Sequence, residues 1–226
     1  MTQIKNLLDW QKDVEINILG SREKERRGHS TCAFADRALY IIAGATRTLS
    51  VHNCQKSVYC FCIEQKEFSK APNLNVKRFC HASCVHGGKI YTFGGWEGII
   101  NASINSIERL DVENNAEDWE LFTIDDIRGV QFPVMSSLSQ RKILIAGGAV
   151  TNSLGKWIEE NREAYVIDER EMVVRKQHFS HDDFCNGRAV MIVPGKVIWI
   201  GPSAGGTDSV HLYDHNTKTF EAIHEF

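Results

Sequence analysis

A short apolar strand that ends in glycine recurs four times in this chain, about fifty residues apart each time. Each copy is a run of apolar or β-branched residues, which is typical of a strand buried on both faces. The glycine lacks a Cβ, so the backbone can turn sharply there and approach a neighbouring element closely. The copies lie at residues 39–44, 90–95, 143–148 and 197–202. Such a period, built on short strands, predicts a propeller or a stacked array of small sheets.

The residues around each apolar strand predict three further strands, so that one repeat is four antiparallel strands joined by turns and loops. A first strand leads through a hairpin into the apolar second strand, a longer loop leads to a third strand, and a tight turn leads to a fourth. The predicted first strands lie at 31–35, 78–85, 132–138 and 189–193, the third strands at 58–63, 106–111, 164–168 and 210–214, and the fourth strands near 67–68, 119–122, 172–174 and 219–223. The predicted repeats span about residues 26–77, 78–127, 128–182 and 183–226.

Residues 1–25 are predicted to form an N-terminal extension or a stray outer strand. Alternation of Val14, Ile16 and Ile18 favours an edge strand at about residues 10–19, with a helix as the alternative. The mixed charge run at residues 21–27 is predicted to be a solvated loop.

These features together resemble the kelch repeat, whose pattern joins an Arg-x-x-His entry, a strand ending in Gly-Gly, and a Tyr-Asp type third strand followed by an aromatic residue. The matching residues are Arg26/His29 and Arg78/His81 at the entry, Gly94-Gly95 and Gly147-Gly148 as complete doublets, and Tyr59 with Phe68, Leu110-Asp111 with Trp119, and Tyr213-Asp214 with Phe220 as the last element. The entry Arg and His are expected to hydrogen-bond backbone carbonyls of a neighbouring loop, with a role in partner binding as the alternative. The resemblance covers about residues 26–224 and implies an all-β, kelch-type β-propeller with four four-stranded blades.

The chain also departs from the kelch pattern. Ala43-Gly44 and Gly201-Pro202 are half doublets, and the entry histidine is interpreted as replaced by Gln131 in the third repeat and by Arg188 in the fourth. Kelch propellers usually have more than four blades, and a ring that stays open leaves an apolar blade face in water. The propeller is therefore expected to be small or open, to be completed by a second copy or another chain, or to be a fragment of a longer gene product.

Composition argues against a polyanionic or membrane partner. The net charge of −3 and a pI near 6.3 provide no field that would attract nucleic acid or acidic lipid. No stretch has the apolar length of a signal peptide or a membrane span. The seven cysteines, an odd number, are interpreted as buried apolar residues in a reducing compartment. We therefore expect a cytoplasmic protein that binds neither nucleic acid nor membrane.

One cluster has side chains of metal-ligand type. His178, His181, Asp182, Asp183 and Cys185 lie in the connection between the third and fourth repeats, and their chemistry suits zinc. An exposed polar loop explains them as well and is preferred, so no metal and no cofactor is predicted. A nucleophile elbow, a Walker loop and a dinucleotide fingerprint are all absent from the sequence, which leaves catalysis unsupported.

The resemblance implies a non-enzymatic interaction module, with a scaffold or adaptor role, that binds a protein or peptide. Kelch propellers bind partners with the loops after their second and fourth strands, which open on one face. Trp and Arg side chains in such loops often dominate the binding energy. The candidate partner-binding residues are Arg47, His52, Trp96, Glu97, Asn101, Trp157, Arg162 and Asp182. Glu159 and Asp183 are placed on the same face. The alternatives are a structural subunit or fragment of a larger propeller and, third, a kelch-type enzyme.

Overall fold

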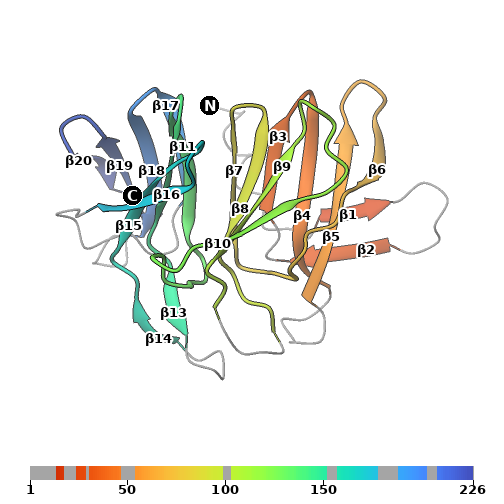
Figure 1. The fold of residues 1–226 in the computed structure, drawn as a ribbon, viewed down its shortest axis with the longest axis horizontal. Coiled ribbons are helices and arrows are strands. Elements are labelled where there is room, and N and C mark those ends of the chain that lie inside the picture. The colour runs from red at the N-terminus through yellow and green to blue at the C-terminus, as the bar shows by residue number, and fades with distance from the viewer. Residues whose placement is uncertain are drawn as a thin grey trace.

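The regular structure of this chain is built from β-strands (Figure 1). The computed structural model describes residues 14–17, 24–28, 31–46, 54–98, 103–151, 157–177, 188–202 and 208–225. Within these ranges no residue is helical, so no helix there could span a membrane. The expected all-β fold class is confirmed.

The strands form four antiparallel four-stranded units, as the repeats predict. The first unit contains β3 (Thr31–Ala35), β4 (Ala38–Thr46), β5 (Cys54–Cys62) and β6 (Glu67–Ala71), and the second contains β7 (Ala82–His86), β8 (Lys89–Phe93), β9 (Ser106–Asp111) and β10 (Glu120–Thr123). The third contains β11 (Val134–Ser139), β12 (Lys142–Ala146), β15 (Ala164–Asp168) and β16 (Val173–Gln177), and the fourth contains β17 (Arg188–Val193), β18 (Lys196–Pro202), β19 (Asp208–Asp214) and β20 (Thr219–Glu225). In every unit consecutive strands pair with each other, which is the strand order of a propeller blade.

The four units stand side by side in chain order (Figure 1). Their first strands form a row in which β3 lies against β7, β7 against β11, and β11 against β17. The second and third units therefore present one sheet face to the preceding unit and the other to the following unit. This arrangement explains why their second strands, β8 and β12, are apolar without alternation, since both of their faces are covered. β18 of the fourth unit is also apolar, although Ile200 is exposed.

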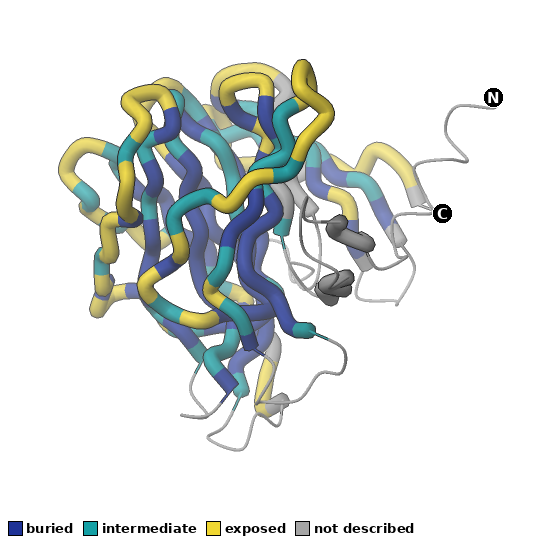
Figure 2. The backbone as a smooth tube through the Cα atoms, turned by 90° about the vertical axis from the view of Figure 1, so that its right-hand side faces the viewer, coloured by how far each residue is buried: buried dark blue, intermediate teal, exposed yellow. Residues whose placement is uncertain are grey.

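Apolar clusters fill the spaces between the units. Ile90 and Leu110 of the second unit pack with Ile42 and Val58 of the first. The opposite face of the second unit packs on the third, and the third packs on Trp199 of the fourth. Figure 2 shows the centres of the strands buried and the hairpin tips exposed. The described cysteine side chains, which are Cys54, Cys60, Cys62, Cys80 and Cys84, are buried or half-buried free thiols, as expected for apolar packing.

At the glycine doublet the backbone of one unit lies close to the backbone of the next. Gly94 and Gly95 have φ angles of 72° and 91°, which L side chains rarely adopt. A Cβ on Gly94 would lie 2.7 Å from the carbonyl oxygen of Val130, and one on Gly95 would lie 2.6 Å from that of Phe79. The N–H of Gly95 donates to the Val130 carbonyl at 2.8 Å, so the segment before the third unit is bonded to the second. The doublet is therefore required by conformation and by close packing.

The half doublets behave differently from each other. Ala43 has a φ of 50° and so keeps the left-handed turn, and the Gly44 N–H donates to the Arg78 carbonyl at 2.9 Å as Gly95 does one unit later. In the fourth unit Gly201 and Pro202 continue the ladder of β18, paired with Ser209 and Asp208. The proline favours this extended conformation in the residue before it.

The structure corrects the positions of two entry residues. Gly95 contacts Phe79 and His81, whereas its counterpart Gly148 contacts Gln131 and Pro133. Gln131 is therefore equivalent to Phe79, and Pro133 takes the place of the entry histidine. Arg188 pairs with Ile200 as Ala82 pairs with Phe93, so it is the first residue of its strand and not the entry position.

Four further strands extend the units. The predicted N-terminal edge strand is β1 (Val14–Asn17), which pairs with β2 (Lys24–Gly28). The charge run that was expected to be a solvated loop thus contains a strand, and β2 also pairs with the end of β4. The expected loop after Gly44 is shortened because β4 reaches Thr46 and β5 begins at Cys54. β13 (Ala149–Thr151) and β14 (Trp157–Glu160), which were not predicted, form a hairpin below the third unit (Figure 1).

Candidate recognition face

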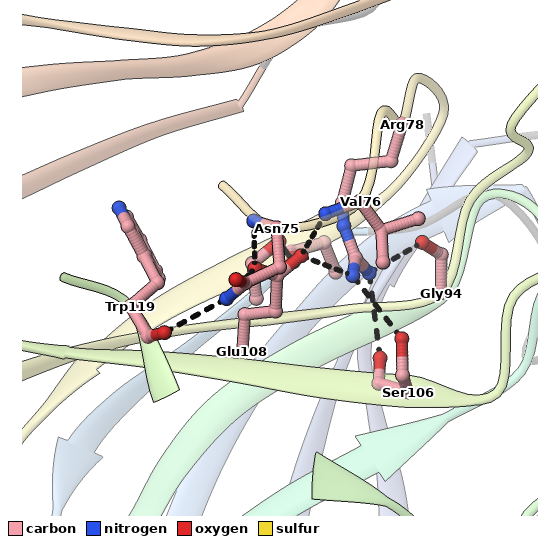
Figure 3. Close-up of polar contacts among 9 residues, drawn as sticks. Asn75, Val76, Arg78, Gly94, Ser106, Glu108 and Trp119 are labelled. Carbon is pink, nitrogen blue, oxygen red and sulfur yellow. Dashed lines mark hydrogen bonds and ion pairs between the residues drawn. The ribbon is translucent and has the colours of Figure 1, made fainter. Parts of the chain in front are cut away.

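A buried ion pair fixes the loop that enters the second unit (Figure 3). Arg78 is fully buried, and its Nη2 lies 2.7 Å from Oε1 of Glu108, which is equally buried. The guanidinium also donates to the carbonyl of Gly94 at 3.0 Å and to that of Ser106 at 3.3 Å. Burial lowers the pKa of Arg78, and the neighbouring Glu108 opposes this shift. The expected bond from the entry arginine to a backbone carbonyl is confirmed.

The same carboxylate holds the loop backbone. Glu108 accepts hydrogen bonds from the N–H groups of Asn75 at 2.5 Å and Val76 at 3.2 Å. The Asn75 amide donates to the Trp119 carbonyl at 2.7 Å, and the Trp119 indole N–H donates to the Pro72 carbonyl at 2.8 Å. Figure 3 shows the loop and strand β9 joined through these contacts. Arg78 and Glu108 therefore position the loop after the fourth strand of the first unit, and they are not themselves accessible to a ligand.

The entry histidine also makes a contact between units. His81 Nε2 lies 2.8 Å from the hydroxyl of Thr31 in the first unit, and that hydroxyl lies 2.6 Å from the hydroxyl of Ser83. Burial first, and the Arg78 charge second, hold the pKa of His81 well below its usual value. His81 is thus a neutral residue that packs one unit against the next. Arg26 lies in β2, and His29 lies outside the described residues.

Trp96 directly follows the glycine doublet and is half-buried. It forms antiparallel bridges with Phe79 and Ser103, and its ring packs on the Phe79 ring with centroids 5.2 Å apart. The thiol of Cys54 donates to the Trp96 carbonyl at 3.6 Å. The indole is therefore part of the packing between the first and second units, and the half-buried Glu97 continues the chain toward the face.

A cleft of about 460 Å³ lies where the loop before the third unit meets the segment after β14. It is lined by Arg128, Glu159, Asn161, Arg162 and Glu163. Arg128 Nη1 and Glu159 Oε1 form an ion pair of 2.6 Å, and both side chains are about half exposed. The buried Asn161 donates through its amide to the Gly147 carbonyl at 2.9 Å, which fixes the cleft to the second doublet.

The wall of the cleft is held by an ionised carboxylate. Glu163 accepts hydrogen bonds from the Tyr165 hydroxyl and the Lys176 ammonium. The bond from Lys176, followed by that from Tyr165, lowers the pKa of Glu163. Burial, together with the Glu163 charge, raises the pKa of Tyr165, so Tyr165 remains a neutral donor. The cleft therefore presents two guanidinium and two carboxylate groups and suits a ligand segment with polar or charged side chains.

The structure brings only some of the predicted site residues together. Arg162 lines the cleft, while Trp96 and Glu97 follow the doublet of the second unit. Trp157 lies in β14, and its side chain is not described. Arg47, His52, Asn101 and Asp182 lie outside the described residues, as do His178, His181, Asp183 and Cys185. Across the part of the chain that the structure describes, no group of three or more His, Cys, Asp or Glu side chains could hold a metal ion.

Sequence reasoning missed three residues that line the cleft, namely Arg128, Asn161 and Glu163. Arg128 lies in a connection between repeats, and such connections are expected to open on the same face as the loops after the second strands. This expectation is the signal by which Arg128 could have been proposed from the sequence. Asn161 and Glu163 lie directly beside Arg162, but only the hydrogen bonds of the folded chain distinguish them from other loop residues.

Comparison with known proteins gives one family match. Residues 77–116 match the family model of the Kelch motif. The match runs from the entry loop held by Arg78 through β7, β8 and β9 into the turn that follows. A search of curated proteins finds no match to the chain.

Proposed function

Because this chain is a kelch-repeat protein, we propose that it is a non-enzymatic interaction module that binds a protein or peptide segment. The binding surface is its recognition face, which we define as the loops after the second strands and after the fourth strands of the four units. Kelch repeats typically mediate contacts between proteins. The observation that carries the proposal is the cleft lined by Arg128, Glu159, Asn161, Arg162 and Glu163 on this face.

The size and the chemistry of the cleft support a peptide ligand. A volume of about 460 Å³ falls within the range of sites that enclose a small ligand or a few side chains. The half-exposed pair of Arg128 and Glu159 contributes little stability, so either group can exchange its partner for a ligand group at small cost. Arginine accepts carboxylates in a bidentate manner, which would align an acidic ligand side chain.

The rigidity of the surrounding sheets also supports the proposal. Loops carried by a fixed scaffold lose little entropy on binding, which favours recognition. Asn161 and the network around Glu108 hold two of these loops in place. Trp96 and Glu97 would flank the ligand, and Arg47, His52, Asn101, Trp157 and Asp182 are proposed as further contacts. A scaffold or adaptor role in the cytoplasm is part of the same proposal.

A charge reversal within the third unit tests the proposal. Arg162 and Arg170 are both exposed, but Arg162 lines the cleft whereas Arg170 lies in the turn at the other end of the sheet. The partner is first captured with the full chain and identified by mass spectrometry, and its affinity is then measured by calorimetry. Arg162→Glu is expected to weaken binding at least about tenfold, which corresponds to about 1.4 kcal/mol. Arg170→Glu, the matched control, is expected to change the affinity less than about twofold.

The opposite outcome would locate the binding surface elsewhere. If Arg170→Glu weakens binding as much as Arg162→Glu, the effect is one of overall charge. If neither variant changes the affinity, the cleft does not contact the partner.

A further inference from the structure

The rim opposite the recognition face repeats one arrangement of charged positions. It is formed by the hairpins between first and second strands and by the turns between third and fourth strands (Figure 1). Each of the last three units begins its second strand with a lysine paired in register with an aspartate, namely Lys89 with Asp111, Lys142 with Asp168, and Lys196 with Asp214. The residue after this aspartate opens the turn and faces the preceding unit. The equivalent turn residues are Val112, Glu169 and His215.

Between the second and third units this rim is electrically balanced. Lys89 Nζ lies 3.4 Å from Oε1 of Glu169 and 3.8 Å from Oδ2 of Asp111. Nε2 of His86 lies 3.8 Å from the other oxygen of Glu169. The lysine of the second unit thus meets a carboxylate supplied by the third.

Between the third and fourth units the carboxylate is replaced by an imidazole. Lys142 Nζ lies 3.4 Å from Nε2 of His215, at the place where Lys89 meets Glu169. The neighbouring carboxylates have other cations, since Asp168 pairs with Arg141 at 3.2 Å and Asp214 pairs with Lys196 at 3.3 Å. The Tyr213 hydroxyl lies 3.2 Å from Nδ1 of His215 and holds the ring in place.

A second replacement adds another cation. Lys218 occupies the turn position that Met172 occupies in the third unit, and both residues have left-handed φ angles, of 60° and 52°. Lys142 and Lys218 are exposed, and His215 is half-buried. Compared with the turn of the third unit, the turn of the fourth unit therefore has a histidine in place of the acidic Glu169 and a lysine in place of Met172.

The cations at this rim act on each other. The charged groups that act on His215 are Lys142 from β12 and Lys218 and Asp214 from its own turn, and the Tyr213 hydroxyl contacts the ring. The Lys218 ammonium itself donates to the side-chain carbonyl of Gln177. Burial first, then the charges of Lys218 and Lys142, lower the pKa of His215 against the opposing effect of Asp214. Burial and Lys142 likewise lower the pKa of Lys218. An anion placed among these groups would relieve their repulsion and favour protonation of His215.

We propose that Lys142, His215 and Lys218 form a binding site for a phosphate-type oxyanion at the rim between the third and fourth units. A phosphate group carries up to two negative charges and three or more acceptor oxygens, which match two ammonium groups and one imidazolium. A lone carboxylate would balance only one of these charges. Free phosphate and a phosphorylated side chain share this chemistry. The site is separate from the recognition face, because it lies at the opposite end of the sheets.

Proton NMR of the His215 ring in the full chain tests the site with inorganic phosphate as the probe. Phosphate is titrated against sodium chloride of equal ionic strength, and the pKa of His215 is followed at each concentration. Phosphate is expected to raise the pKa of His215 while chloride does not, since only a bound anion stabilises the imidazolium. Lys142→Gln and Lys218→Gln are each expected to weaken phosphate binding about tenfold.

The matched control is Lys66→Gln. Lys66 has a left-handed φ of 57° in the equivalent turn of the first unit, and it is exposed like Lys218. It should leave phosphate binding unchanged. The proposal is overturned if phosphate and chloride shift the His215 pKa equally, or if Lys66→Gln weakens binding as much as Lys218→Gln.

A peptide arm distinguishes the two sources of the anion. A phosphoserine peptide is compared with its unphosphorylated form and with inorganic phosphate in the same measurement. Tighter binding of the phosphopeptide identifies a phosphorylated side chain as the ligand, whereas equal or weaker binding identifies free phosphate. A shift caused equally by the unphosphorylated peptide would contradict an oxyanion site.

Discussion

At the scale of single residues, buried polar groups hold the face in place. Arg78 and Glu108 are fully buried, and together they bond the entry loop, the doublet and strand β9. A buried charge left without its partner is strongly unfavourable, whereas a surface pair contributes little. The chain contains both kinds of pair in adjacent positions, because Arg109 and Glu120 form a pair of 2.6 Å in which Glu120 is exposed.

Glu108→Gln should therefore destabilise the protein by about 3–5 kcal/mol, because it leaves Arg78 charged and buried. Glu120→Gln, which breaks the exposed pair with Arg109, should cost less than about 1 kcal/mol. Urea unfolding followed by circular dichroism gives both free energies of unfolding. Equal losses in the two variants would mean that the Arg78 pair is not buried as described.

His81 makes the stability depend on pH. Its pKa is held well below its ordinary value of about 6.5 in the folded state, so below pH 6.5 the unfolded chain binds a proton that the folded chain does not. The free energy of unfolding is then highest above pH 6.5 and falls as the pH drops toward the folded pKa, by up to about 1.4 kcal/mol per pH unit. His81→Gln should flatten this slope, as measured by urea unfolding at a series of pH values.

The exposed His224 provides the control. His224→Gln should leave the slope below pH 6.5 close to that of the unchanged protein. A His81→Gln variant with the original slope would show that the histidine does not titrate in the way its burial requires.

At the scale of the element, the glycine doublet decides how one unit meets the next. Gly94→Ala places a methyl group 2.7 Å from the Val130 carbonyl at a φ of 72°, so we expect a loss of at least about 2 kcal/mol in the free energy of unfolding. Ala43→Gly at the equivalent turn should change stability by less than about 1 kcal/mol. Removal of the left-handed strain at this position stabilises the folded protein. Loss of the buried methyl group and the greater entropy of the unfolded chain destabilise it, so the effects largely cancel. Thermal unfolding of both variants measures the contrast, and a tolerated Gly94→Ala would contradict the close approach.

The elements that could be predicted best from the sequence are the second strands, whose apolar runs became β4, β8, β12 and β18. In β8 and β12 neighbouring units cover both faces, so the side chains have no alternative placement. In β18 the run is equally apolar although Ile200 is exposed. Strand β2 is rich in charged residues and forms by pairing with β1 and β4, which local patterning does not reveal. The hairpin of β13 and β14 is short and follows a doublet that was interpreted only as a turn.

The candidate site was less predictable than the strands. Arg162 could be proposed from its place in a loop, but Arg128 joins it only because the second and third units pack together. The position of the entry histidine in the third repeat was wrong by two residues, because no hairpin length fixes the segment before β11. The contacts of Gly148 with Gln131 and Pro133 fix it in the folded chain.

At the scale of the whole molecule, the chain is a row of like units joined through a small number of repeated contacts. The second glycine of one unit bonds to the segment that enters the next unit, first from Gly44 to Arg78 and then from Gly95 to Val130. A further bond runs from the Phe132 N–H to the Cys80 carbonyl at 2.7 Å. In such arrays stability is the sum of the units and of their nearest-neighbour contacts.

Hydrogen exchange at the amides of Gly44, Gly95 and Phe132, measured by NMR, tests the packing of consecutive units most directly. These amides donate to the segments that enter neighbouring units, so only the described packing protects them. We predict protection comparable to that of Tyr91 in β8, a strand paired on both edges. Exchange of the three amides at the rate of an unstructured peptide, with Tyr91 still protected, would contradict the account of consecutive four-stranded units packed through their glycine doublets.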